Sequence, residues 1–322
     1  MKFDVRYRTL ISYEELAVDS HNEVRARPAE TPFQKVVDYS LLVSPPASIR
    51  RFVDGWGTLV DSFGIRLPHI AMEVVAEATV ETTMPPEVTA LVSLDGLNDL
   101  QFVDTHYEFL VPTPSTTPSP AMAALAAELR AQATHVLGLV SSLQEAVVQH
   151  FDYRTGATSV TTTAAEAFEL GAGVCQDHAH VMVALARLVG LPARYVSGYF
   201  FTAADHDGAD SEDDLVTVQT HAWVEIAIPG HRWLAMDPTN GLVPGERHVK
   251  IGHGPDYSAV MPFRGTFIGP DSSEVTASVQ IRRRSRQTTE VLPEFSTVSE
   301  SDIRLANAEA ASGQDQQQQQ QQ

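Results

Sequence analysis

The chain has 322 residues and carries 41 acidic against 22 basic side chains, which gives a formal net charge of −19. Such a surface repels nucleic acids and anionic membranes, so the composition argues against both as partners. A chain of 322 residues usually folds as two domains, and its hydrophobic content of 43% is enough for a sizeable core.

The cysteine content and the N-terminus bear on where the protein works. The chain has one cysteine, Cys175, which cannot form an internal disulfide and suits a reducing compartment. The first ten residues, MKFDVRYRTL, lack the apolar segment of a secretory signal. No apolar run approaches the ~20 residues that a membrane-spanning helix needs. We therefore expect a cytoplasmic protein.

Residues 1–112 have the pattern of an all-β, sandwich-like domain. Short segments alternate or run apolar, and turn formers such as Ser44-Pro45-Pro46 separate them. Strands are expected at Phe3–Tyr13, Lys35–Val43, Leu59–Leu67 and Ala71–Thr82. The stretch VPTPSTTPSP, residues 111–120, is rich in proline, serine and threonine, so residues 113–120 are expected to form an extended linker.

Residues 121–284 are expected to form a second domain of helices and strands. Apolar residues in 121–151 recur at helical spacing, which predicts one or two helices. A Thr163–Glu166 capping box begins a short helix, and residues 174–189 are apolar enough for a buried helix. Strands are expected at Arg194–Thr202, Leu215–Ile228 and Arg232–Met236, followed by a further strand pair.

Two polar segments are expected to remain outside the packed core. Residues 285–322 end in seven glutamines and cannot bury enough apolar surface to order themselves, so they predict a disordered tail. The acidic stretch DHDGADSEDD, residues 205–214, lacks the glycine and Asp/Asn spacing of a calcium loop. We therefore expect no calcium dependence and no cofactor.

The stretch GAGVCQDHAH, residues 171–180, places Cys175 at the predicted start of a helix. There the sulfur lies at the positive end of the helix dipole, which favours the thiolate, and free backbone N–H groups can hold an oxyanion. The preceding glycines let the backbone approach closely. This pattern predicts that Cys175 is a nucleophile and that Asp177 caps or braces the first turn.

A thiol nucleophile needs a histidine and a group that orients this histidine. His221 and Asp237 lie in TVQTHAWVEIAIPGHRWLAMDPTNG, which has the pattern of a β-hairpin turning at Pro229-Gly230. A two-residue turn places residue 238 opposite His221, and a slip of one residue places Asp237 there, with Cβ atoms ~5 Å apart. Asp237 can then bind one nitrogen of His221 and leave the other to face Cys175.

Simpler explanations exist for each of these residues taken singly. A lone cysteine is usually a small buried hydrophobic residue. His221 could merely pack beside Trp223, and Asp237 could be a turn residue before Pro238. These alternatives stay open, although all three residues fit the catalytic pattern together.

A metal site formed by Cys175, His178 and His180 is another alternative. On a helix, residues 175 and 178 share a face, but residue 180 lies about 140° from residue 178, so the three side chains diverge. No second cluster completes a tetrahedral ligand set. We therefore expect no metal here, and we expect the base to be His221 rather than His178 or His180.

Several motifs of the chain occur in an order that is typical of one family. GAGVCQDHAHVMVALARLVGLPARYVSGYF is followed by HAW and DPTN, and this order resembles the transglutaminase-like superfamily over residues 120–282. HNEVRARP and DGWGTLVDSF resemble the β domain that precedes the catalytic core in many bacterial members. His178 stands where the family commonly has an aromatic residue. The resemblance implies a papain-like α+β core, in which a helix bearing Cys175 packs against an antiparallel sheet bearing His221 and Asp237.

The residues and the resemblance together predict thiol-dependent acyl transfer. Cys175 attacks a protein or peptide amide with His221 as general base and Asp237 as orienting carboxylate, and the thioester then passes to an amine or to water. The three residues do not distinguish these acceptors, so a cysteine protease or amidase remains an alternative. A non-catalytic protein-binding module is an alternative of a different class.

Overall fold

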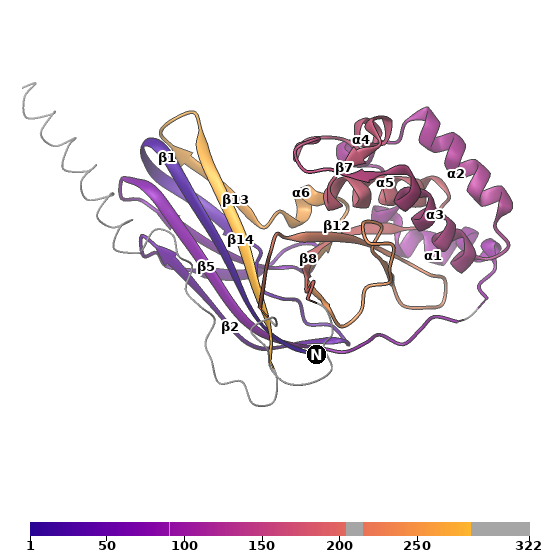
Figure 1. The fold of residues 1–322 in the computed structure, drawn as a ribbon, viewed down its shortest axis with the longest axis horizontal. Helices are drawn as coiled ribbons and strands as arrows, with labels where there is room; N and C mark the ends of the chain where they lie inside the picture. Colours follow the sequence, from indigo (N-terminus) through magenta and orange to yellow (C-terminus); the bar gives the residue numbers. More distant parts are fainter. Residues whose placement is uncertain (90, 204–214, 285–322) are drawn as a thin grey trace, which may run out of the picture. The chain divides into compact units, whose positions relative to one another are not determined.

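The computed structural model describes residues 1–89, 91–203 and 215–284 (Figure 1). The chain forms two compact units, each built from separate stretches of sequence. Among the described residues, the sheet unit comprises residues 1–83, 199–203, 215–220 and 261–284, and the mixed unit comprises residues 84–89, 91–198 and 221–260. The acidic stretch 205–214 and the tail 285–322 lie outside the described residues.

A single long strand, β1 (Lys2–Val24), organises the sheet unit. Within the described residues it belongs to an eight-stranded sheet and pairs antiparallel with β4, β5, β13 and β14. Figure 1 shows β2, β5, β1 and β14 side by side. The other strands of this sheet are β2 (Gln34–Ser44), β3 (Arg50–Val53), β4 (Leu59–Ile65), β5 (His69–Thr82), β9 (Leu215–Val218), β13 (Phe263–Ile268) and β14 (Ser273–Arg283).

Alternating side chains build the core of the sheet unit. Buried and part-exposed residues alternate along β5, as expected for a strand with one covered face. On β1, Phe3 and Tyr7 are buried, and each contacts an aromatic ring from the distant segment that follows residue 198. The ring centroids of Phe3 and Phe201 lie 5.1 Å apart, and those of Tyr7 and Tyr199 lie 6.5 Å apart.

The unit boundaries differ from the expected division at residues 112 and 113. The first segment of the sheet unit ends at Thr83, and the following residues form short helices instead of strands: η1 (Leu94–Asn98), α1 (Leu100–Thr105) and η2 (Tyr107–Phe109). At the other end, β14 belongs to the sheet unit because it pairs with β1 from Phe3 to Tyr13. Pairing between the two ends of a chain leaves no local pattern, so the sequence did not indicate it.

The expected linker, residues 113–120, is packed instead of extended. It contains the short helix η3 (Pro114–Thr116), and Thr116 is fully buried. The Thr116 hydroxyl accepts a hydrogen bond of 2.8 Å from Nη1 of Arg187, a buried residue of the mixed unit. Arg187 also donates to the carbonyl oxygens of Phe109, Ala193 and Pro255. This segment is therefore part of the mixed unit.

The mixed unit places its helices around a four-stranded sheet. The sheet has the order β11–β10–β8–β12, and β6 and β7 form a separate two-stranded ladder. The strands are β6 (Asp152–Tyr153), β7 (Ala172–Gly173), β8 (Ala193–Phe200), β10 (His221–Ile226), β11 (Leu234–Met236) and β12 (His248–Gly254). The helices are α2 (Pro120–Gln132), α3 (Val136–His150), α4 (Ala164–Leu170), α5 (Cys175–Leu188) and α6 (Tyr257–Val260).

Helix α5 forms the centre of the mixed unit. All of its residues from Gln176 to Arg187 are buried, and the helix packs against β10 on one side and α2, α3 and α4 on others (Figure 1). This burial explains the nearly continuous apolar stretch after His180. The predicted α+β class is confirmed: a helix that begins at Cys175 packs against an antiparallel sheet that contains His221.

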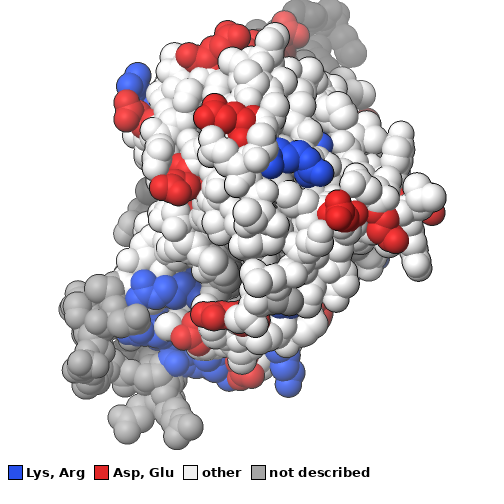
Figure 2. All heavy atoms as spheres, turned by 90° about the vertical axis from the view of Figure 1, so that its right-hand side faces the viewer, with Lys and Arg blue, Asp and Glu red and all other residues white. Residues whose placement is uncertain are grey.

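Two features of the described residues concern membrane spans and surface charge. No helix in the described ranges is long and apolar enough to cross a membrane. Uncharged side chains cover most of the face shown in Figure 2, and the acidic and basic side chains are scattered between them. Six of the acidic residues that contribute to the formal net charge fall in residues 205–214, outside the described part of the chain.

Candidate active site

The start of α5 is fixed by Asp177, which lies one turn into the helix. Its Oδ2 atom accepts hydrogen bonds from the backbone N–H of Val174, at 2.8 Å, and from the hydroxyl of Thr158, at 2.7 Å. A carboxylate at this position satisfies a free amide of the helix start and favours the dipole. Asp177 therefore has the capping role that the sequence predicted, and it fixes the turn that carries Cys175.

Gly173 is required by the same contact. A Cβ atom at this position would lie 2.5 Å from Oδ2 of Asp177 and 2.7 Å from its Cβ atom. Such a distance is far below van der Waals contact, so any larger residue forces the carboxylate out of place. The glycine thus provides the clearance that the sequence predicted.

We expect Gly173→Ala to lower the free energy of unfolding by about 1–3 kcal/mol, because the new methyl group overpacks against Asp177. Activity should fall with it, since the helix start moves. Thermal unfolding of the two variants Gly173→Ala and Gly55→Ala measures the effect. Gly55 is the matched control, because a Cβ atom there meets nothing within 4 Å. Equal stability of both variants would contradict the proposed clearance.

Cys175, His221 and Asp237 form a continuous hydrogen-bonded chain. The Cys175 side chain, which is partly exposed, hydrogen-bonds to His221 at the first position of β10. Nε2 of His221 lies 2.8 Å from Oδ2 of Asp237. Since Asp237 binds Nε2, the ring nitrogen left for the thiol is Nδ1. The structure therefore brings together all three residues that the sequence selected.

The route by which Asp237 reaches His221 differs from the predicted cross-strand pair. The β10–β11 ladder pairs Val224 with Met236 and extends no further. Asp237 leaves β11 at this point and forms a bridge with Leu242 instead. Asp237 thus contacts His221 through its side chain, from a turn, and the predicted register of the hairpin was wrong. The turn gives the carboxylate more hydrogen-bond donors than a strand position would.

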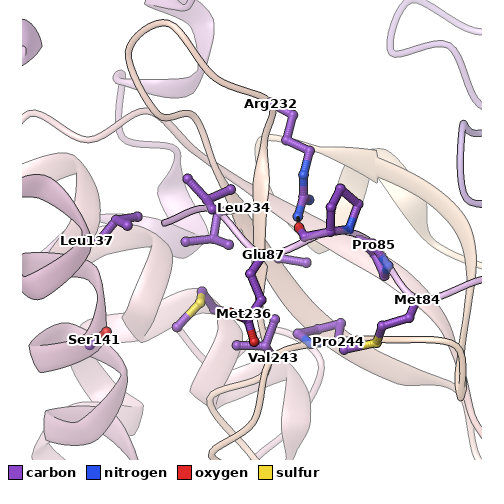
Figure 3. A pocket seen from close by; sticks show the side chains of 13 residues that line it. Met84, Pro85, Glu87, Leu137, Ser141, Arg232, Leu234, Met236, Val243 and Pro244 are labelled. Carbon is purple, nitrogen blue, oxygen red and sulfur yellow. Dashed lines mark hydrogen bonds between the residues drawn. The ribbon is translucent and has the colours of Figure 1, made fainter. Parts of the chain in front are cut away.

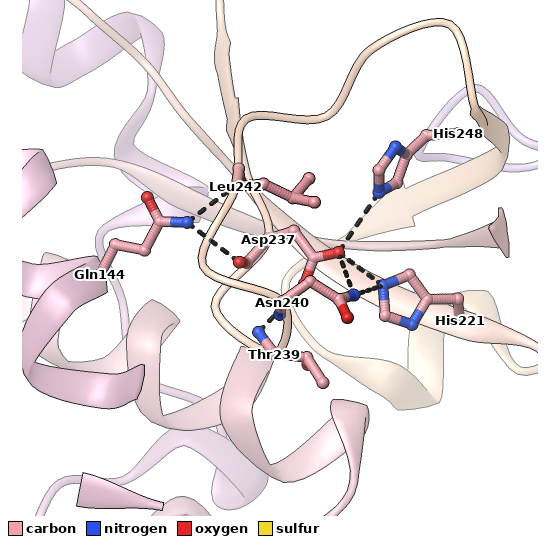
Figure 4. A network of polar contacts seen from close by, with 7 residues as sticks. All are labelled: Gln144, His221, Asp237, Thr239, Asn240, Leu242 and His248. Carbon is pink, nitrogen blue, oxygen red and sulfur yellow. Dashed lines mark hydrogen bonds and ion pairs between the residues drawn. The ribbon is translucent and has the colours of Figure 1, made fainter. Parts of the chain in front are cut away.

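Asp237 is fully buried and accepts hydrogen bonds at both carboxylate oxygens (Figure 4). Oδ1 accepts from the backbone N–H groups of Thr239, at 3.0 Å, and Asn240, at 3.1 Å. Oδ2 accepts from Nδ2 of Asn240, at 2.8 Å, in addition to His221. His248 contributes a further contact, with Nε2 3.2 Å from the same oxygen. Such a set of donors fixes the carboxylate in one orientation.

Gln144 of α3 hydrogen-bonds to the main chain of the turn that carries Asp237. Its Nε2 group donates to the carbonyl oxygen of Asp237, at 2.9 Å, and to that of Leu242, at 3.0 Å (Figure 4). The helix therefore anchors both ends of the bridge that carries the carboxylate.

The hydrogen bonds keep this network charged in spite of its burial. Burial disfavours the ionised form of Asp237, but hydrogen bonds from His221, His248 and Asn240 outweigh it and hold the Asp237 pKa well below its usual range. Burial likewise opposes a charged His221, yet its hydrogen bonds to Asp237 and Cys175 raise its pKa to about 9. His221 is therefore protonated near neutral pH.

His248 behaves differently although it shares the same carboxylate oxygen. Burial lowers its pKa, and the charge of His221 acts in the same direction, whereas Asp237 opposes them. A neutral His248 can still donate its Nε2 hydrogen to Asp237. His248 thus supplies a hydrogen bond without adding a second positive charge.

The two histidines next to Cys175 in sequence have other partners. Nδ1 of His178 hydrogen-bonds with the carbonyl oxygen of Val174, at 2.9 Å, and its ring lies 4.5 Å from that of Phe151. His180 is buried and its Nε2 accepts the backbone N–H of Tyr257, at 3.1 Å. Burial lowers the His180 pKa to about 4. These contacts give both histidines structural roles. Neither histidine is positioned to bind a metal ion together with Cys175.

His221, Asp237 and His248 form a different group, whose ligand atoms lie within 4.8 Å of one another. A transition metal accepts two histidines and a carboxylate. Here, however, both Nε2 atoms are directed at Oδ2 itself, and Oδ1 is held by two backbone amides (Figure 4). A metal would have to displace a fully buried carboxylate from these donors. The geometry fits shared protons better than a metal ion.

An apolar cavity of about 260 Å³ is lined in part by Ala235 and Met236, the two residues that precede Asp237. Figure 3 shows Met84, Pro85, Leu234, Met236 and Val243 around it. Arg232 closes one end by donating to the carbonyl oxygen of Pro86. The lining residues include none of Cys175, His221 and Asp237, so the cavity is separate from the thiol.

Sequence reasoning missed Gln144, Asn240 and His248. Asn240 had a signal, because it belongs to the DPTN motif, where an Asp–x–x–Asn turn can bring the amide back to the carboxylate. Gln144 and His248 had none, since each contacts Asp237 from an element that is distant in the chain or in the sheet order.

Comparisons with known proteins place this chain in a family. The model of the Transglutaminase-like superfamily matches residues 123–238, and that of the Bacterial transglutaminase-like N-terminal region matches residues 3–81. A Mycobacterium leprae (strain TN) protein, "Uncharacterized protein ML0607", is 30% identical over 271 residues, which cover 84% of this chain and 95% of that protein. The chain belongs to the transglutaminase-like superfamily. Members of this superfamily are usually enzymes.

Two further matches concern the fold and one part of the chain. The chain matches a solved structure from Cytophaga hutchinsonii, described as a "Putative Cysteine Protease", with a TM-score of 0.69 and 24% identity, over 94% of this chain and 96% of that one. This likeness supports the fold. A stretch of 133 residues is 31% identical to the Pseudomonas aeruginosa "Protein-glutamine gamma-glutamyltransferase", but it covers 39% of this chain and 19% of that protein.

We expect His248→Leu to lower kcat/KM by about 10- to 100-fold, because the charged carboxylate of Asp237 loses one of its hydrogen-bond donors. His248→Gln should recover most of the loss, since its Nε2 donor reaches about as far as that of histidine. His253→Leu is the matched control, because His253 lies on the same strand but contacts Arg194. Steady-state kinetics of the three variants measure the effect. Equal losses in His248→Leu and His253→Leu would count against a specific role of His248.

Proposed function

We propose that the protein is a thiol acyl-transfer enzyme in which Cys175 is the nucleophile, His221 the acid and base, and Asp237 the orienting carboxylate. The hydrogen-bonded chain from Cys175 through His221 to the buried Asp237 is the observation that carries this proposal. Membership of the transglutaminase-like superfamily supports a thiol-dependent activity of this general kind. Protein or peptide amides are the proposed substrates.

The reaction begins with attack of the Cys175 sulfur on an amide carbonyl carbon. The carbonyl oxygen takes the negative charge, and the backbone N–H at the start of α5 donates to it. His221 then gives its proton to the departing nitrogen, so that the C–N bond breaks, an amine or ammonia leaves and a thioester remains. Asp237 holds His221 at Nε2 throughout, which keeps Nδ1 directed at the reacting atoms.

The second half of the reaction consumes the thioester. His221, now neutral, takes a proton from the incoming acceptor as this attacks the thioester carbon. The Cys175 thiolate leaves, and the proton stays on His221, which restores the starting pair. An amine acceptor gives a new amide bond, whereas water gives a carboxylate. The same residues serve both outcomes, so a cysteine protease or amidase remains the second candidate.

A non-catalytic binding module would not need this network. It would bury an ionised carboxylate and a protonated histidine beside a thiol with no use for them, although burying charges costs free energy. Hydrogen bonds from Gln144 and His248, on two distant elements, and from Asn240 in the same turn maintain this arrangement. These contacts favour the enzymatic proposal.

Incubation with a peptide library and a labelled primary amine tests the proposal. The wild type and Cys175→Ala are compared by mass spectrometry. Amine incorporation that depends on Cys175 supports transamidation, peptide cleavage supports a protease, and loss of the amide nitrogen without incorporation supports an amidase. Identical products from wild type and variant would reject the enzymatic proposal.

A further inference from the structure

The apolar cavity of about 260 Å³ lies against both ends of the turn that carries Asp237. Met236, which precedes Asp237, lines the cavity (Figure 3). Val243, which follows the bridge partner Leu242, lines it as well. All of the lining residues belong to the mixed unit. A molecule in this cavity would therefore contact the chain immediately before and immediately after the bridged turn.

Helix α3 connects the same cavity with the same turn. Leu137 and Ser141 of this helix line the cavity. Gln144, which donates to the carbonyl oxygens of Asp237 and Leu242, follows on the same helix. Positions 137, 141 and 144 share one face, because residues three and four apart lie above one another on a helix. The cavity thus touches the helix face that anchors the turn as well as the turn itself.

The lining of the cavity is suited to an aromatic group. Leu137, Leu234 and Val243 supply aliphatic surface, and Met84 and Met236 supply thioethers (Figure 3). Methionine adapts to ligands of different shape, and its sulfur makes favourable contacts with aromatic rings. An engineered apolar cavity of ~150 Å³ binds benzene in another protein. A cavity of about 260 Å³ therefore has room for one aromatic ring with a short substituent.

The charged side chains of the lining favour an uncharged ligand, because their signs are opposite. Glu87 and Arg232 both line the cavity, and the Arg232 guanidinium donates to the carbonyl oxygens of Pro86 and Trp233. A ligand of either sign would have one like charge in the lining. Such a ligand would also lose part of its hydration on entering an apolar cavity, which costs free energy. An uncharged molecule avoids both costs.

We propose that this cavity binds a small, uncharged aromatic molecule and that the bound molecule stabilises the turn that holds Asp237. The ligand contacts Met236 and Val243 on the two sides of the bridge, so opening the bridge between Asp237 and Leu242 would disrupt its site. Ligand binding and closure of the bridge are therefore coupled, and each favours the other. Because Asp237 orients His221, the ligand acts on a group of the candidate active site from a separate cavity.

Titration of the wild type with toluene tests the binding site, and ligand-observed NMR measures the dissociation constant. Benzoate and benzylamine are charged analogues of similar size, one negative and one positive at neutral pH. Each should bind about 10-fold more weakly than toluene, because the cavity does not replace the hydration of its charge. Binding of either analogue as tightly as toluene would overturn the assignment of an uncharged ligand. Absence of saturable toluene binding up to its solubility would overturn the site.

Two substitutions that fill the cavity from different walls test its location. Val243→Trp adds a large ring at a position that is 51% exposed, and Ser141→Met extends the side chain on α3. Each should weaken toluene binding by about 10-fold or more, since it occupies the volume of the ligand. Leu100→Trp is the matched control, because Leu100 is 85% exposed, belongs to the same unit and does not line the cavity. Unchanged affinity in both filling variants, or an equal loss in Leu100→Trp, would overturn the location.

Hydrogen exchange of the wild type tests the coupling without any turnover. The backbone N–H of Asp237 donates to the carbonyl oxygen of Leu242 at 2.9 Å, so it exchanges when the bridge opens. At a toluene concentration of about ten times the dissociation constant, this exchange should slow about 10-fold. The N–H of Arg154, which donates to Gly173 at 2.8 Å, is the control, because neither residue lines the cavity. Unchanged exchange at Asp237, or equal slowing at Arg154, would overturn the coupling. Turnover that does not depend on Cys175 would reject the proposed function alone.

Discussion

Cys175→Ala is expected to lower kcat/KM by about 10⁴- to 10⁶-fold, the largest effect of any single substitution in the chain. The variant removes the sulfur that is proposed to form the thioester and that hydrogen-bonds to His221. The residual rate would come from the helix amides and from binding of the substrate alone. Ammonia release from a glutamine peptide measures the loss.

The same variant should fold normally, because Cys175 is only partly buried and lies at the first position of α5. A change in the free energy of unfolding below about 1 kcal/mol is expected for such a substitution. Cys175→Ser is the second variant, since it keeps the size and the hydrogen bond but replaces the sulfur with a weaker nucleophile. Activity of Cys175→Ala within 10-fold of the wild type would remove Cys175 from the mechanism.

Asp237→Asn should lower kcat by about 10³- to 10⁴-fold, although the two side chains have the same shape. The amide can donate to Nε2 of His221, which places the hydrogen of the neutral ring on Nδ1, so that the neutral ring can no longer accept a proton at Nδ1 from the thiol or from the incoming acceptor. The carboxylate that helps to raise the His221 pKa to about 9 is also lost. The pH profile of kcat/KM reports both changes.

The sign of the pH effect follows from the raised pKa of His221. In the wild type the protonated ring persists to about pH 9, so the alkaline limb of kcat/KM should lie near that pH. The same ion pair stabilises the fold fully below the ordinary histidine pKa of about 6.5, and this contribution is lost as the pH rises through about 9. In Asp237→Asn the alkaline limb should move toward lower pH.

A second buried aspartate supplies the control for Asp237→Asn. Asp256 is 4% exposed and bonds to the hydroxyl and the backbone of Ser258, away from His221. Asp256→Asn should therefore leave the alkaline limb of the kcat/KM profile unchanged, even if the variant lowers the free energy of unfolding. An alkaline limb that moves equally in both variants would show that the effect comes from the loss of a buried charge in general.

The three candidate residues could be predicted from the sequence because each lies in a recognisable local pattern. The glycines before Cys175 and the acid after it mark a helix start, and the structure has both at the expected positions. His221 and Asp237 stand in a hairpin pattern of the right length. The register of that hairpin was not accessible, since Asp237 leaves its strand to bridge Leu242 and is then held by Gln144.

The residues that support the site lie on elements that are distant from one another in the chain. β12, which carries His248, follows β11 in the chain, yet β10 and β8 lie between them in the sheet. No spacing rule predicts that His248 reaches Asp237. The division into units was missed for the same reason, because β14 returns from residues 273–283 to pair with the first strand. Local patterns predict elements, whereas pairing of distant elements decides which side chains assemble.

The most direct test of the central claim is the alkylation rate of Cys175 at pH 6. Since the chain has one cysteine, a single iodoacetamide adduct reports on this thiol alone in the intact mass. A thiolate held by protonated His221 predicts rapid alkylation of the wild type at pH 6 and a rate at least 10-fold slower in His221→Ala. Equally slow alkylation of both proteins, rising in parallel only toward alkaline pH, would contradict the coupling between Cys175 and His221.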